Sequence, residues 1–74
     1  MEEKQPEYGL EMLRILMERK FSEPTISAAV GFCRLESMNP QNAFKAVRDY
    51  LLEHPEVEEK VFWKYLQNEV RGNY

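Results

Sequence analysis

The chain has very little cysteine, histidine and glycine, and this scarcity excludes several kinds of chemistry. Its 74 residues include one cysteine, Cys33, one histidine, His54, and three glycines. One cysteine cannot close an internal disulfide, and this pair of side chains cannot complete a zinc site. No glycine-rich phosphate loop, calcium loop or acyl-transfer motif is present. We therefore predict a protein that is not an enzyme and that uses no metal and no cofactor.

The chain also has no long apolar run and no excess of positive charge. No run approaches the roughly 20 residues that cross a bilayer, and residues 1–6 are polar and acidic, unlike a secretory signal. The 10 basic and 13 acidic residues give a net charge of −3, whereas broad nucleic-acid binding depends on a basic surface. We predict a cytoplasmic protein without a membrane span, and nucleic acid is not the expected partner.

The composition that remains is that of a small globular domain. The chain is 43% hydrophobic and 31% charged, which separates it from disordered chains. We predict a single helical domain over residues 1–74, with a frayed N-terminus at residues 1–6. A core of this size contributes only about 3–5 kcal/mol, so such a chain gains stability from a partner or from self-association.

Proline positions and apolar periodicity predict the secondary structure. Strand-like alternation and hairpin-turn dipeptides are absent. Each of the four prolines stands just before a helical pattern, where a missing N–H is tolerated. The predicted helices begin near Glu7, Ser22, Asn39 and His54. We predict an all-α fold, a compact single domain of four short helices in an orthogonal or bundle-like arrangement.

The second and third predicted helices each have one clear apolar face. On the second helix this face consists of Ile26, Ala29, Val30 and Cys33. On the third it consists of Ala43, Phe44, Val47, Tyr50 and Leu51. Because Cys33 lies on such a face and no spacing brings His54 to it, the pattern predicts a buried and unreactive thiol.

The first and fourth predicted helices carry more apolar side chains than one core-facing stripe requires. The stripe of the first includes Leu13, Leu16 and Met17, with Leu10 and Ile15 flanking it on opposite sides. The fourth has two stripes, Val57–Val61–Tyr65 and Phe62–Leu66–Val70, with Trp63 beyond the second. We assign the first of these stripes to the core, because the helix enters from the corner at Pro55. Part of Phe62 is assigned to the core as well, and Trp63, Leu66 and Val70 are then left for a partner.

This surplus predicts a small protein-binding or regulatory protein that acts through an apolar surface of its first and fourth helices, with a homodimer as one form of that interaction. Aromatic residues and methionine are enriched at the centres of interfaces. The predicted contact residues are Leu10, Ile15, Leu52, Trp63, Leu66 and Val70. Glu56, Glu58 and Glu59 are expected to orient a basic partner surface.

A helix-turn-helix DNA-binding regulator is the first alternative. The second and third helices form the pair in this interpretation, and the third presents Gln41, Asn42, Lys45 and Arg48. Such side chains read base edges or hold phosphates. The acidic balance of the chain and the length of the segment 36–40 weigh against this alternative.

A second alternative is a ubiquitin-associated-like binding module. The run Leu13, Leu16, Phe21, Ala29-Val30, Asn42, Ala46-Val47 and Leu51-Leu52 loosely resembles ubiquitin-associated domains. The resemblance implies three helices in which the loop after the first and a Leu-Leu pair at the end of the third hold ubiquitin. Of that family's Met-Gly-Phe loop only Phe21 is present, and the fourth helix is additional.

Overall fold

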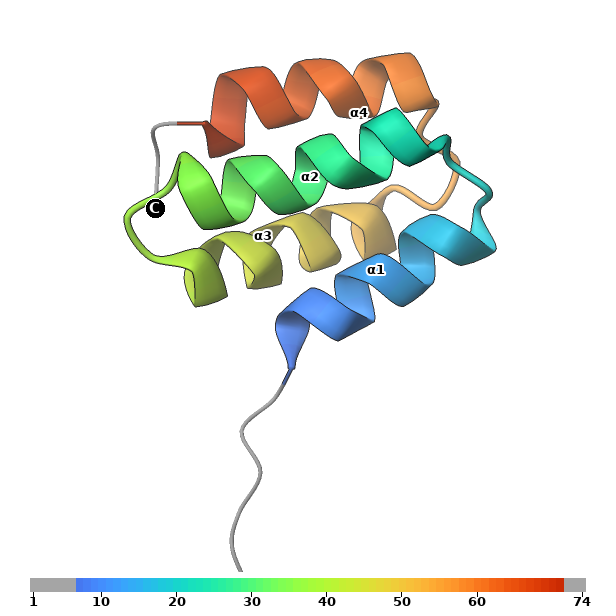
Figure 1. Cartoon of the computed structure of the whole chain (residues 1–74). Helices are drawn as coiled ribbons and strands as arrows, with labels where there is room; N and C mark the ends of the chain where they lie inside the picture. The colour runs from blue at the N-terminus through green and yellow to red at the C-terminus, as the bar shows by residue number, and fades with distance from the viewer. Residues whose placement is uncertain (1–6, 72–74) are drawn as a thin grey trace, which may run out of the picture.

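A computed structural model describes residues 7–71 and shows an all-α fold within them (Figure 1). The elements are α1 (Tyr8–Glu18), α2 (Glu23–Leu35), α3 (Pro40–Glu53), α4 (Glu59–Tyr65) and a π-helical turn, η1 (Leu66–Val70), that continues α4. No strand occurs in this part of the chain. The predicted fold class is confirmed. The predicted fraying of residues 1–6 lies outside the described residues.

The helices form a bundle with α2 and α3 at its centre (Figure 1). In this view α4 lies above α2, and α1 lies in front, beside α3. Helices α1 and α3 run in one direction, and α2 and α4 run in the opposite one. Helix α1 packs mainly on α3, whereas α2 packs on both α3 and η1. The helix at the N-terminus is therefore peripheral, and only part of its circumference is covered.

The core draws on every helix at a spacing of four residues. Its fully buried apolar members are Met12, Leu16, Ala29, Cys33, Ala43, Val47, Leu51, Phe62, Leu66 and Val70. One polar residue, Thr25, is equally buried. The predicted faces of α2 and α3 are confirmed at the centre of each face, and the predicted burial of Cys33 is confirmed as well.

Helices α2 and α3 begin where local sequence signals place them. Ser22 is the N-cap of α2, with Pro24 in its first turn. In α3 the Asn39 side chain accepts a hydrogen bond of 3.2 Å from the backbone N–H of Asn42, and Pro40 is the first helical residue. Asn39 thus satisfies one unpaired N–H of the first turn of α3, and each proline omits one; the Ser22 side chain makes no capping hydrogen bond.

Helix α4 begins later than predicted. The expected start at His54 is wrong, because the chain turns at Pro55–Glu56 and the helix begins at Glu59. In this turn the N–H of Val57 donates to the carbonyl of His54 at 3.1 Å. Proline disfavours helical geometry in the residue before it, which separates α3 from α4. Glu56 and Glu58 therefore lie outside the helix, and only Glu59 lies in its first turn.

The core-facing stripe of α4 is the opposite of the predicted one. Phe62, Leu66 and Val70 are buried, whereas Val61 is 48% exposed. The corner at Pro55 does not set the rotation of the helix, because several non-helical residues follow it. The Phe62 ring lies 5.5 Å from that of Phe21, so the stripe with the larger side chain fills the core. The assignment of Leu66 and Val70 to an exposed contact side is therefore wrong.

A hydroxyl at the start of α2 joins α2 to α4. The indole N–H of Trp63 donates to Oγ1 of Thr25 at 2.7 Å. Both Ser22 and Thr25 donate through their hydroxyls to Oε2 of Glu59. These bonds hold the pKa of Glu59 below its ordinary value, and the bond from Ser22 has the larger effect. The Trp63 ring also meets Phe32 edge-on, with centroids 6.3 Å apart. Trp63 is thus a half-buried packing residue of the α2–α4 seam.

Helix α1 ends in a Schellman motif without glycine. The N–H of Phe21 donates to the carbonyl of Leu16 at 3.2 Å, and that of Lys20 donates to Met17 at 3.0 Å. Lys20 takes a φ of 60°, the left-handed geometry in which a Cβ is crowded and glycine is favoured.

Lys20→Gly is expected to stabilise the protein. Removing the Cβ at this φ should raise the free energy of unfolding by about 0.5–1 kcal/mol. Urea unfolding followed by circular dichroism measures the change as a shift of the midpoint at constant slope. Lys20→Ala is the matched control and should give no comparable gain, because alanine keeps the Cβ. Equal effects of the two variants would contradict a backbone cause.

Trp63→Ala is expected to destabilise the fold. Loss of the indole should lower the free energy of unfolding by about 2 kcal/mol or more, because a large packed side chain and a partly buried hydrogen bond disappear together. Trp63→Phe keeps an aromatic ring, although a smaller one, and removes the N–H, so its expected cost is about 1 kcal/mol or more. Thermal unfolding of dilute samples measures both, and an unchanged midpoint for Trp63→Ala would contradict the packing role.

Candidate protein-binding face

The six contact residues predicted from the sequence do not gather on one surface. Leu66 and Val70 belong to the core, and Trp63 packs against α2. Leu10 and Leu52 are 57% and 58% exposed. They lie on different helices, and Ile15 is half-buried on the flank of α1 opposite Leu10. The predicted surface of the first and fourth helices is therefore not assembled.

The flank of α1 that carries Ile15 faces α3. Glu11, one turn before Ile15, receives a hydrogen bond of 2.5 Å from the Arg48 guanidinium of α3. The Arg48 group also lies 4.9 Å over the Tyr8 ring. At the far end of the same seam, Arg19 donates to the carbonyls of Leu51 at 2.6 Å and His54 at 3.2 Å. The opposite flank of α1 is left uncovered by α3.

That uncovered flank of α1 is apolar. Leu10, Leu13 and Met17, with Arg14 and Glu18 beside them, line a shallow hollow of about 530 Å³. Met17 was predicted to be a core residue, but it is 65% exposed because α1 is covered on one side only. Helical spacing of three and four residues places these three apolar side chains on one strip.

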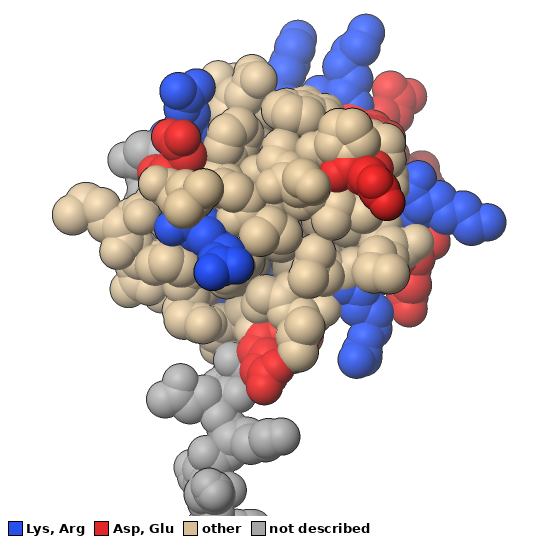
Figure 2. Space-filling model, in the orientation of Figure 1, with Lys and Arg blue, Asp and Glu red and all other residues tan. Residues whose placement is uncertain are grey.

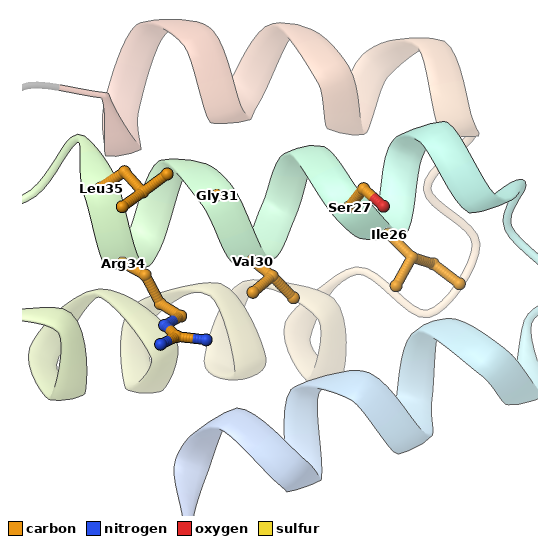
Figure 3. Close-up of a pocket in the computed structure, with 6 residues that line it drawn as sticks. All are labelled: Ile26, Ser27, Val30, Gly31, Arg34 and Leu35. Carbon is orange, nitrogen blue, oxygen red and sulfur yellow. The ribbon is translucent and has the colours of Figure 1, made fainter.

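Helix α2 has a second hollow of about 510 Å³ on its outer surface (Figure 3). Its lining residues are Ile26, Ser27, Val30, Gly31, Arg34 and Leu35. In Figure 3, Ile26, Val30 and Arg34 point from α2 toward the side on which α1 and α3 run. A Cβ placed on Gly31 would have no neighbour within 4 Å, so the helix surface is open there. Leu35 is 83% exposed at the edge of the hollow.

The two hollows lie on adjacent helices, and Ile26 and Val30 of α2 point toward the side on which α1 runs. The other flank of α2, which carries Phe32 and Thr25, contacts Trp63 of α4. Helix α1 is in contact with α2. Figure 2, in the orientation of Figure 1, shows a broad uncharged surface on this side, with most charged groups around its margin. We name as the α1–α2 face the residues Leu10, Leu13, Met17, Ile26, Val30 and Leu35.

The sequence reasoning identified only Leu10 of this face as a contact residue. Leu13 and Met17 were placed on the buried stripe of the first helix. Ile26 and Val30 were placed on the apolar face of Ala29 and Cys33, but both are only half-buried. The spacing of Ile26, Val30 and Arg34 indicates a second strip of α2 beside the buried one, and this pattern could have predicted the exposed face. Leu35 gave no signal apart from its position outside the core spacing.

The residues of the DNA-binding alternative lie on α3, and their two cations are ion-paired. Arg48 contacts Glu11 at 2.5 Å and Asp49 at 2.7 Å. Hydrogen bonds to Glu11, and then to Asp49, raise the pKa of Arg48 above its ordinary value. Lys45 lies 3.8 Å from Asp49. Gln41 and Asn42 are exposed, but the positive charge beside them is compensated by carboxylates.

The residues of the ubiquitin-associated alternative are also dispersed. Leu51 is fully buried, and Phe21 packs on Phe62. Only Leu52 of the Leu-Leu pair is exposed. The loop and helix end that the resemblance implies therefore do not present a common apolar surface.

Cys33 and His54 lie in different surroundings. Cys33 is buried in α2, and desolvation raises the pKa of its thiol to about 12. His54 ends α3, with its ring 4.6 Å from that of Tyr50. Among residues 7–71, no cluster of three His, Cys, Asp or Glu side chains is arranged to hold a metal. In the same residues no helix has both the length and the apolar character needed to span a membrane.

The buried thiol predicts slow chemical labelling. With a pKa of about 12, on the order of one thiol in 10⁴ is ionised at pH 8, and only the thiolate reacts. Labelling of Cys33 by a maleimide should therefore be slow in buffer and fast in 6 M guanidinium at the same pH. Mass spectrometry measures both rates, and equal rates in the two solvents would contradict the burial of Cys33.

Comparison of the chain with protein-family models, with curated proteins and with solved structures found no match.

Proposed function

We propose that this protein is a protein-binding module that engages its partner through the α1–α2 face. The observation that carries the proposal is that six exposed or half-buried apolar side chains line two hollows on the adjacent helices α1 and α2. Isolated apolar residues are common on surfaces, whereas contiguous patches mark interaction sites.

The chemistry of this face suits a protein better than a nucleic acid. Methionine and branched aliphatic side chains gain free energy when another apolar surface removes them from water. Nucleic acids are bound mainly through positive charge on the protein. The face has Arg14 and Arg34 near its edges, and Glu18 offsets part of that charge. The cations of α3 are already paired within the chain.

The proposal keeps the predicted class of function and changes the surface. Helix α2 replaces the fourth helix, because α4 directs its apolar stripe into the core. Of the three acidic residues predicted to orient a partner, Glu59 has another role, since it accepts hydrogen bonds from Ser22 and Thr25. Charged groups beside the α1–α2 face, such as Arg14 and Glu18, are the ones placed to orient a partner.

Site-specific photocrosslinking tests the proposal. With p-benzoylphenylalanine at Met17, irradiation of cells of the source organism should yield a discrete protein adduct, because this position lies within the face. Val61 is the matched control, since it is also exposed and apolar but lines a hollow between α3 and α4. No adduct at Met17, or equal adducts at both positions, would overturn the proposal. The mass of the adduct distinguishes a second copy of the chain from a different protein.

A further inference from the structure

We infer that the α1–α2 face is self-complementary and that it binds a second copy of this chain, with the two α2 helices antiparallel about a two-fold axis. The inference rests on the proposed function and specifies its partner. A two-fold interface requires one patch to complement itself, both in charge and in shape. The outer strip of α2 meets both requirements in a single register.

The charges at the two ends of this strip are opposite. Glu23 lies in the first turn of α2 and Arg34 in the last. At 100° per residue the two positions lie about 20° apart around the helix axis. Both side chains are exposed, and neither has an ion-pair partner within residues 7–71. They are 11 residues apart, or about 16 Å along the helix, too far to pair within one chain. An antiparallel pairing sets each Glu23 against the partner's Arg34, twice per dimer.

The same register matches large side chains with small ones. When Glu23 is opposite the partner's Arg34, Ile26 is opposite Gly31 and Val30 is opposite Ser27. The open surface above Gly31 leaves room for the Ile26 side chain of the other copy. Close approach at small residues lets two helices pack ridge into groove. The helix therefore carries both halves of a complementary contact.

Helix α1 supplies the rest of the contact area. A 13-residue helix is only about 20 Å long, whereas a stable interface buries about 800 Å² per partner. That is about 15% of the 5294 Å² accessible surface of this chain. A partner helix seated on the Val30 flank of α2 also covers Leu13 and Met17 of α1, which line the neighbouring hollow. Assembly of this kind stabilises small domains.

A charge swap across α2 tests the pairing. Sedimentation equilibrium should show a reversible dimer of the unaltered chain at roughly 1–100 μM, the affinity of a modest interface. Glu23→Arg should weaken dimerisation by about fivefold or more, because it sets two like-charged pairs in contact. The double variant Glu23→Arg/Arg34→Glu should recover the original affinity to within about twofold. Glu53→Arg, an exposed charge change on α3, is the control and should have little effect.

Gly31→Leu separates dimerisation from folding. The new side chain projects into open space in the monomer and replaces a poor helix former, so the thermal midpoint of a dilute sample should be unchanged or higher. In the dimer it occupies the place of the partner's Ile26, and association should fall by about tenfold or more. A dimer unaffected by Gly31→Leu, or a Glu23→Arg defect that Arg34→Glu does not rescue, would overturn this pairing.

The failure of this inference and that of the proposed function are distinguishable. The inference of a second copy is overturned if the chain stays monomeric at about 100 μM, because this concentration is far above micromolar dissociation constants. If the Met17 crosslinker then captures a different protein and the Val61 crosslinker does not, the proposed function stands. If both positions capture nothing, both proposals fail.

Discussion

The position of α4 depends on one buried hydroxyl, that of Thr25. It accepts the indole N–H of Trp63 and donates to Glu59, so two residues one turn apart on α4 are held at one point of α2. A buried hydroxyl without partners costs free energy, which makes this arrangement specific as well as stabilising. Once α4 is held there, the Phe62 stripe faces inward and the bundle closes around it.

A different set of contacts holds α1, and these contacts decide which of its sides stays open. Arg48 binds Glu11 and lies over Tyr8, while Arg19 satisfies carbonyl groups at the end of α3. Both arginines join the same flank of α1 to α3. The bundle has no further helix to cover the other flank among the described residues, so Leu10 and Met17 remain exposed. The open apolar strip is thus a consequence of how the peripheral helix is attached.

The face that results combines an apolar surface with few charges and a small-residue gap on α2. Val30 and Ile26 lie beside Gly31, where the backbone can be approached closely. The same helix directs Ala29 and Cys33 inward, so one element supplies both a wall of the core and an outward binding strip. A rigid core beneath a binding strip reduces the conformational entropy that a partner has to remove on binding.

Local sequence alone determined four helices, the starts of α2 and α3, and the burial of Cys33. Asn39 and Pro40 act within their own first turn, so no distant contact is needed to interpret them. Contacts between helices set the rotation of α4 and the peripheral place of α1. These depend on residues such as Thr25 and Trp63, 38 positions apart. Periodicity shows that a helix has apolar stripes, but the partner that covers each stripe is selected by packing and polar contacts between helices.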